Sequence, residues 1–168
     1  MILITGINGE IGHGLVKRLS NQVNDKIIGL DINQPNNKIK QYIHKFYEGS
    51  ILDGELLTKI FSEFKFTSIY HLAAILSTKA ESNPFQAHQV NVQGFINLVK
   101  TSLENTEDIK FFFPSSIAVY YLNDKHVPPF SENMYCNPNN IYGCNKLYCE
   151  KLGIYYSKHY HQLSKDFE

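Results

Sequence analysis

Short apolar runs alternate along the chain with longer stretches in which apolar residues recur every three or four positions. A short apolar run bounded by turn residues is typical of a buried strand, and the longer spacing is typical of a helix packed on one face. The predicted strands span residues 1–5, 26–31, 45–49, 68–73 and 109–114, and the predicted helices lie near 10–22, 53–64, 84–104 and 139–160. This alternation predicts an α/β fold, a Rossmann-type doubly wound parallel sheet of five strands. Residues 115–138 are rich in proline and asparagine and are predicted to form a long loop of the kind that is functional or disordered.

The length and charge of the chain narrow the classes of protein to which it can belong. With 168 residues it is long enough for one domain and too short for two, so we expect a single unit over 1–168. Its 16 basic and 16 acidic side chains cancel, which argues against a nucleic-acid or membrane-surface partner. No apolar run approaches the ~20 residues that span a bilayer. We expect a cytoplasmic protein without a metal, in which Cys136, Cys144 and Cys149 stay reduced, because their spacing matches no zinc pattern and their number is odd.

A glycine-rich turn follows the first predicted strand. In TGINGEIG, residues 5–12, Gly6, Gly9 and Gly12 have the spacing G-x-x-G-x-x-G, a relative of the dinucleotide-binding pattern. The start of the next helix offers free N–H groups and a partial positive charge to a pyrophosphate. A tight turn needs glycine with or without a ligand, but its place after an N-terminal strand favours dinucleotide binding.

An acidic residue ends the second predicted strand. Asp31 lies nineteen residues after Gly12, close to the spacing at which a carboxylate accepts hydrogen bonds from the ribose hydroxyls of the adenosine. The stretch INQPNNK that follows holds no arginine for a 2′-phosphate, so we predict NAD rather than NADP as the cofactor. A plain turn residue at a strand end is the alternative for Asp31 taken alone.

A tyrosine and a lysine lie four positions apart on the last predicted helix. Positions four apart share a helix face about 6 Å apart along the axis, so Tyr142 and Lys146 are predicted to point to the same place. An ammonium beside a phenol lowers its pKa, which suits the pair to proton transfer. The alternative is a solvated helix face. The serines of PSSIAVYY, residues 114–121, favour the first interpretation, because they follow a strand at the sheet edge where ligands of such folds bind.

Six motifs in this order resemble the extended short-chain dehydrogenases, the NAD-dependent epimerase/dehydratase superfamily. They are the glycine turn, Asp31, HLAA (71–74), NVQGFIN (91–97), the double serine 115–116 and YGCNK (142–146). Within the superfamily, residues 69–98 and 114–121 are most similar to the short-chain type of L-threonine 3-dehydrogenase. The resemblance covers essentially the whole chain.

The resemblance implies which positions hold the cofactor. The residues that it assigns to NAD are Gly6, Asn8, Gly9, Ile11, Gly12, Asp31, Ser50, Ile51, Leu72, Ala73, Ala74, Asn91, Tyr142 and Lys146. Ser50 stands where the superfamily usually has an aspartate beside the adenine amino group, with Asp53 three residues on.

The resemblance also implies a catalytic set. Ser116 would be the catalytic hydroxyl, Tyr142 the general base, and Lys146 the residue that lowers the pKa of the tyrosine. Ser77 would contact the substrate together with Ser116 and Tyr142. The implied reaction is hydride transfer from L-threonine to NAD to give 2-amino-3-ketobutyrate, in a homodimeric enzyme.

Besides Ser50, two further departures from the family pattern affect these expectations. Tyr120 and Tyr121 replace an aromatic-glycine pair after the double serine. The family also continues through a sixth strand, a Tyr-Pro-Gly segment and a substrate-binding region, so we expect 1–168 to be a truncated NAD-binding domain with an uncovered edge at residues 110–113, able to hold NAD weakly and inactive alone. The alternatives are a nucleotide-sugar epimerase or dehydratase and a non-catalytic NAD-binding or interaction module.

Overall fold

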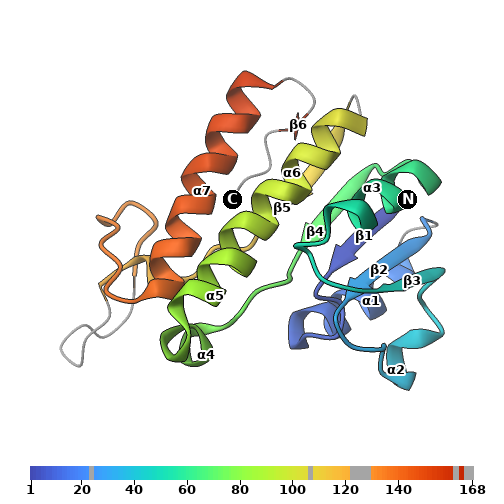
Figure 1. Ribbon diagram of the computed structural model, residues 1–168, viewed down its shortest axis with the longest axis horizontal. Helices are drawn as coiled ribbons and strands as arrows, with labels where there is room; N and C mark the ends of the chain where they lie inside the picture. The colour runs from blue at the N-terminus through green and yellow to red at the C-terminus, as the bar shows by residue number, and fades with distance from the viewer. Residues whose placement is uncertain (23–24, 106–107, 122–129, 161–162, 165–168) are drawn as a thin grey trace.

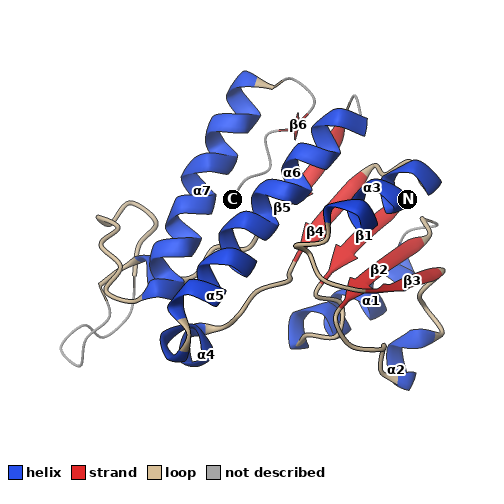
Figure 2. Cartoon of the chain, viewed as in Figure 1, coloured by secondary structure: helices blue, strands red, loops and turns tan. Residues whose placement is uncertain are grey.

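The structure of the chain is a computed structural model that describes residues 1–22, 25–105, 108–121, 130–160 and 163–164. Helices and strands alternate along these ranges (Figures 1 and 2). Part of the predicted loop 115–138, residues 122–129, lies outside the described residues. Among the described residues, we find no helix that combines the length and the apolarity needed to cross a membrane.

The strands form one parallel sheet in the order β3-β2-β1-β4-β5-β6. The five predicted strands are confirmed as β1 (Ile2–Thr5), β2 (Ile27–Asp31), β3 (Lys45–Glu48), β4 (Ser68–His71) and β5 (Ile109–Phe112). The central strand β1 pairs with β2 through Ile2 and Ile27 and with β4 through Ile2 and Ser68. All the strands therefore end at one edge of the sheet, where the loops that carry the predicted site begin.

The sheet has one strand more than the sequence predicted. β6 (Leu163–Ser164) pairs with β5 through Ile109 and Lys110. The predicted uncovered edge at residues 110–113 is therefore wrong at Lys110, which β6 covers. Two residues carry too little apolar periodicity to be recognised as a strand in the sequence.

Helices cover both faces of the sheet, but unequally. The long helices α3 (Gly54–Glu63), α6 (Gly94–Asn105) and α7 (Ile141–His159) share one face, and Figure 1 shows α6 and α7 on the viewer's side of the sheet. On this face Phe95 and Leu98 pack with Phe111 in the larger apolar core. The other face packs against α1 (Glu10–Gln22) and the short α2 (Asn37–Lys40) in a separate, smaller core.

The long helix predicted near 84–104 is divided into three pieces. They are α5 (Pro84–His88), the π-helical turn η1 (Gln89–Gln93) and α6. A π-helical turn inserts one extra residue into the helix and is often found at functional sites. The structure also contains α4 (Ser77–Ser82) and the 3-10 turn η2 (Ile117–Val119), which the sequence pattern did not predict because each is less than two turns long.

Candidate active site

The first glycine of the turn is required by the backbone. Gly6 has φ +69°, a conformation that side chains disfavour, and its N–H donates to Leu30 O at 2.8 Å. A Cβ at this position would lie 2.5 Å from Ala73 N. The turn is therefore pressed against the segment that leaves β4, and only glycine fits between them.

The second and third glycines differ in what surrounds them. A Cβ at Gly12 would lie 2.4 Å from Ile7 O, so Gly12 lets α1 start close to the turn. Gly9 is exposed, and a Cβ there would meet only Gly6 O at 3.2 Å. The outer side of the turn is open at the start of α1, where the N–H groups of a helix lack partners within the helix. This arrangement fits a phosphate group approaching Gly9 and the neighbouring Ile11, which is 62% exposed.

Asn8 connects the glycine turn to the loop after β2. Its amide nitrogen donates to Asn33 O and Gln34 O at 2.6 and 2.8 Å, and its oxygen accepts from Asn36 N at 3.2 Å. The backbone N–H of Asn8 donates to the Asp31 carboxylate at 3.0 Å. The structure thus places Asp31 beside the turn, as the spacing in the sequence predicted.

Backbone N–H groups orient the Asp31 carboxylate and leave it with further hydrogen-bond acceptor positions. Oδ2 accepts from Asn8 N and Oδ1 accepts from Asn33 N, each at 3.0 Å. A carboxylate has about four acceptor positions, so each oxygen can accept one more hydrogen bond. The half-buried Asp31 can therefore receive two hydroxyls of a ribose that lies next to the phosphate turn.

The residues predicted beside the adenine have other contacts as well. Ser50 Oγ accepts from Leu52 N at 3.2 Å, and Asp53 accepts from Leu56 N at 2.9 Å as the N-cap of α3. Ile51 is 4% exposed, and a Cβ on Gly94 would come within 2.5 Å of it. The Ile51 side chain therefore belongs to the core, which leaves its backbone as the part that could face a cofactor.

The loop after β4 is held from two sides. Leu72 N donates to Thr5 O at 3.0 Å, and Ala73 N donates to the Thr5 hydroxyl at 3.4 Å. Further along, the Asn91 side chain accepts from Ile75 N at 2.7 Å and donates to Ile75 O at 3.0 Å. Asn91 lies in η1, so the π-helical turn presents an amide that pins this loop. Asn91 thus supports the loop through Ile75, and Ala74 lies between the two fixed points.

Two contacts fix the start of the helix that carries Tyr142. Asn140 caps α7 by accepting from Gly143 N at 2.8 Å, and Glu81 of α4 accepts from Ile141 N at 2.7 Å. A carboxylate is favourable at the positive end of a helix. Glu81 also joins α4, whose first residue is the exposed Ser77, to the beginning of α7. The predicted substrate-contacting serine therefore lies on an element that touches the helix carrying Tyr142.

The structure brings Ser116 and Tyr142 together. Ser116 is the N-cap of η2, where its hydroxyl accepts from Ala118 N at 3.2 Å. Burial raises the pKa of Tyr142 above its ordinary value of 10.0, and a hydrogen bond from Ser116 opposes that rise. The two hydroxyls therefore meet at the carboxyl edge of the sheet, and the phenol is protonated at neutral pH.

Lys146 occupies a different position from the one that the helix spacing suggested. Its ammonium donates to Pro114 O at 2.8 Å and lies 4.3 Å from the centre of the Phe113 ring. It lies farther from the Tyr142 ring, at 5.7 Å from the ring centre. Lys146 is not a cause of the pKa change at Tyr142 in this structure. The predicted effect of Lys146 on the tyrosine thus requires its ammonium to move from the Pro114 carbonyl toward the phenol.

The buried ammonium of Lys146 is expected to lower the stability of the folded chain at neutral pH. It is 5% exposed, and burial lowers its pKa from 10.5 to about 8, which corresponds to about 3 kcal/mol against the charged form at neutral pH. Lys146→Met is expected to raise the unfolding free energy at pH 7 by about 1–2 kcal/mol, since loss of the Pro114 hydrogen bond offsets about 1 kcal/mol. Thermal unfolding should show a midpoint about 2–4 °C higher for each kcal/mol gained.

The pH dependence of the unfolding free energy tests whether the buried charge of Lys146 is the cause. The folded chain releases the Lys146 proton near pH 8 and the unfolded chain near 10.5, so the unfolded state binds more protons between these values. Wild-type stability should therefore gain relative to the methionine variant as pH rises from 8 to 10.5. A methionine variant that is less stable than wild type at both ends of this range would contradict the explanation.

A buried histidine below the site was not predicted as a functional residue. His71 is 1% exposed and shares a hydrogen bond of 2.7 Å between its Nδ1 and the Thr5 hydroxyl. Its ring stacks on Phe113 at 5.9 Å between centres. Burial, together with the charge of Lys146, lowers the pKa of His71 to about 3, so the ring is neutral. The HLAA motif contains this residue, but the sequence gives no indication that the charge of Lys146 acts on it.

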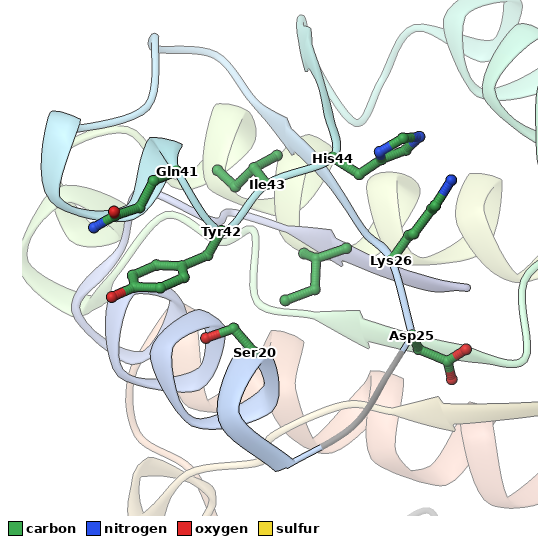
Figure 3. Close-up of a pocket in the computed structure, with 8 residues that line it drawn as sticks. Ser20, Asp25, Lys26, Gln41, Tyr42, Ile43 and His44 are labelled. Atoms are coloured by element: carbon green, nitrogen blue, oxygen red, sulfur yellow. The ribbon is translucent and has the colours of Figure 1, made fainter.

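An open pocket lies at the opposite edge of the sheet. It has a volume of about 460 Å³ and is lined by the start of β2 and by side chains of α1 and of the segment before β3. Figure 3 shows Lys26 and His44 extending to one side and Gln41 and Tyr42 to the other, so these polar groups do not converge. The predicted cofactor and catalytic residues all lie at the carboxyl edge instead.

Comparisons with known proteins identify relatives of this chain. Residues 2–164 match the model of the NAD dependent epimerase/dehydratase family. A curated relative, an uncharacterized epimerase/dehydratase of Staphylococcus haemolyticus, is 33% identical over 92% of this chain and 48% of its own length. The chain thus spans about half the length of the curated relatives that it matches.

Two solved structures have the same fold over nearly the whole chain. A monomeric L-threonine 3-dehydrogenase from a metagenome is 40% identical with a TM-score of 0.82, over 96% of this chain and 50% of the other. The UDP-glucose 4-epimerase of Brucella ovis, in complex with NAD, is 26% identical with a TM-score of 0.81, over 95% and 48%.

Proposed function

Because the chain belongs to the NAD dependent epimerase/dehydratase family, we propose that it binds NAD at the carboxyl edge of its sheet and supplies the acid–base residues for oxidation of a substrate hydroxyl, with L-threonine as the substrate. The observation that carries the proposal is the clustering of groups along one edge. The glycine turn and Asp31 lie together there, joined by the Asn8 N–H at 3.0 Å. Ser116 and Tyr142 meet further along the same edge.

The residues present fit a dinucleotide in their chemistry. The open side of Gly9 admits a phosphate to the start of α1, and Asp31 has acceptor positions for ribose hydroxyls. NAD, when bound, accepts a hydride from the carbon that carries the substrate hydroxyl. A 2′-phosphate would be repelled by the Asp31 carboxylate, which favours NAD over NADP.

Residues of this chain remove the proton from the substrate hydroxyl. Ser116 orients the substrate hydroxyl, and Tyr142 removes its proton as the hydroxyl becomes a carbonyl. Burial raises the pKa of Tyr142, so the phenol needs a nearby positive charge to act as a base near neutral pH. We assign this charge to Lys146, moving toward the phenolic oxygen from its contact with Pro114.

Two observations favour L-threonine over a nucleotide sugar. The threonine dehydrogenase is more similar to this chain than the Brucella epimerase, at 40% against 26% identity, and another UDP-glucose 4-epimerase reaches 32%. The chain also resembles threonine dehydrogenases in 69–98, which includes α4 and its predicted substrate contact Ser77. A nucleotide-sugar epimerase or dehydratase is the second candidate, because the epimerase shares the fold with NAD bound. A homodimer stays a prediction.

Titration with NAD tests the first half of the proposal. Wild type is expected to bind NAD and to bind NADP more weakly. Asp31→Asn should weaken NAD binding by about 10–100-fold, because hydrogen bonds to a charged group contribute about 1.5–3 kcal/mol. Asp25→Asn is the matched control, since it also removes one carboxylate but lies near the N-terminal ammonium at the opposite edge of the sheet. Calorimetry that detects no NAD binding by wild type at millimolar cofactor would sink the proposal.

Measurement of NADH formation tests the second half. Incubation with NAD and L-threonine is compared with incubation with UDP-glucose, using the 168-residue chain and the longest protein that its gene encodes. Threonine-dependent NADH that is lost in Tyr142→Phe supports the dehydrogenase. Conversion of the nucleotide sugar without net NADH supports the epimerase instead.

A further inference from the structure

The segment between β5 and η2 carries the catalytic serine but belongs to no strand. Residues 113–116 leave the sheet after Phe112 and reach Ser116, the N-cap of η2. Ser116 must stay within reach of Tyr142 for the site to work, and displacements of about 1 Å are costly in catalysis. Side chains outside the segment therefore have to hold it in place.

Three residues of α7 contact this segment, each one helical turn after the last. Tyr142 meets Ser116, Lys146 donates to Pro114 O at 2.8 Å, and Glu150 accepts from the Ser115 hydroxyl at 2.9 Å. Positions four apart lie about 6 Å apart along a helix and on the same side. One stripe of α7 thus touches three consecutive residues, and Glu150 provides the contact farthest from the chemistry.

We propose that Glu150 is a positioning residue that acts through Ser115, holding the 114–116 segment so that Ser116 and the Pro114 carbonyl keep their places beside Tyr142 and Lys146. This inference rests on the proposed function, because it concerns the same site. It assigns different roles to the two adjacent serines, with Ser115 anchoring the segment and Ser116 facing the reaction.

The contacts of the Glu150 carboxylate suit this role. Its Oε2 accepts from Ser115, while Oε1 contacts the Lys151 ammonium at 2.8 Å. The Lys151 side chain is 62% exposed and that of Glu150 is 25% exposed, so the surface lysine orients the carboxylate from the solvent side. A hydrogen bond to an ionised acceptor is about twice as strong as one between neutral groups. A hydroxyl of the segment is thereby tied to a helix that Asn140 and Glu81 already fix at its start.

The pKa of Lys146 reports whether the 114–116 segment stays packed against α7. Its ammonium faces Tyr142 and Cys149 on α7 and His71 on β4, and burial lowers its pKa to about 8. Release of the 114–116 segment admits water and should raise the pKa of Lys146 toward its ordinary 10.5. If the segment stays in place, removing the negative charge of Glu150 would instead lower the pKa of Lys146. The sign of the change therefore separates positioning from plain electrostatics.

The experiment follows Lys146 by NMR of the 168-residue chain labelled with [13Cε]lysine, with Lys146→Met identifying its signal. Ser115→Ala and Glu150→Ala are expected to raise the Lys146 titration midpoint above wild type. Ser115→Thr keeps the hydroxyl and Glu150→Gln keeps an acceptor, so both should leave the midpoint unraised. Glu104→Ala is the matched control, because it breaks a glutamate–lysine pair on α6 that, among the described residues, makes no hydrogen bond with the 114–116 segment, and it should also leave the midpoint unraised.

Unchanged or lowered midpoints in both Ser115→Ala and Glu150→Ala would overturn the proposal. If Glu150→Ala does not fold, Ser115→Ala decides, because it deletes a single hydroxyl from the same contact. The measurement requires no NAD. Failure of wild type to bind NAD would therefore count against the proposed function and leave the result on Glu150 readable.

Discussion

Replacing Gly143 with alanine is expected to destabilise the protein by about 3 kcal/mol, at the upper end of what overpacking usually costs. A Cβ at Gly143 would lie 2.0 Å from Ala118 O and 2.9 Å from the side chain of Pro138. The nearest obstacle is a backbone carbonyl of η2, which cannot rotate away as a side chain can. Either α7 or η2 must move, and that movement separates Tyr142 from Ser116.

Gly14→Ala is the matched control for this change. Gly14 also lies inside a helix, α1, but a Cβ there would meet nothing within 4 Å. Alanine is favoured over glycine in helix interiors by about 1 kcal/mol, so this variant should be slightly more stable than wild type. Urea unfolding measures both changes. Equal midpoints for the two variants would show that the contact between α7 and η2 is not as tight as the structure indicates.

Acid is expected to unfold the protein through His71. Burial lowers the pKa of His71 from 6.5 to about 3, so the unfolded chain takes up this proton below pH 6.5 while the folded chain resists it down to about 3. The unfolded state binds more protons within that window, so stability is complete above pH 6.5 and is lost as pH falls. The full window corresponds to about 5 kcal/mol, which is comparable with the whole stability of many domains.

His71→Phe should remove most of this dependence. Phenylalanine keeps a ring among Phe95, Phe111 and Phe113 and removes a buried Nε2 that has no partner among the described residues. Between pH 6.5 and 4.5 the variant is expected to gain about 3 kcal/mol relative to wild type. Urea unfolding at several pH values measures the difference, with the exposed His44→Gln as the control. Parallel stability curves for wild type and His71→Phe would refute the assignment.

The elements that the sequence predicted correctly are those with local causes. β1 and β2 are continuous apolar runs, and α1 and α3 carry apolar residues at helical spacing, so their patterns identify them without knowledge of the rest of the chain. The division of the helix near 84–104 could not be predicted in this way. Both polar atoms of the Asn91 side chain form hydrogen bonds with the backbone of Ile75, sixteen residues earlier. No local sequence pattern predicts such a partner.

The candidate site shows the same division between local and distant causes. The need for glycine at residues 6 and 12 follows from the turn itself, and the structure gives each a close backbone neighbour. Asp31 was placed by spacing and does lie beside the turn. The contact of Lys146 with Pro114 joins residues 32 positions apart, and helical spacing to Tyr142 pointed elsewhere. The anchoring of Ser115 by Glu150 was not predicted, because the double serine alone does not distinguish its two hydroxyls.

The strand order has a consequence for synthesis on the ribosome. Of the six described strands, β1 emerges first and lies inside the sheet, with β2 on one side and β4 on the other. The β1, β2 and β3 half can pair as soon as residue 48 has emerged, and this half already contains the glycine turn and Asp31. The other flank of β1 stays unpaired until β4 arrives, some twenty residues later in the chain. Thr5, which hydrogen-bonds to His71 and Ala73 on that flank, gains these contacts only after β4 has been made. The nascent chain can therefore form the contacts between the glycine turn and Asp31 before those around Ser116 and Tyr142.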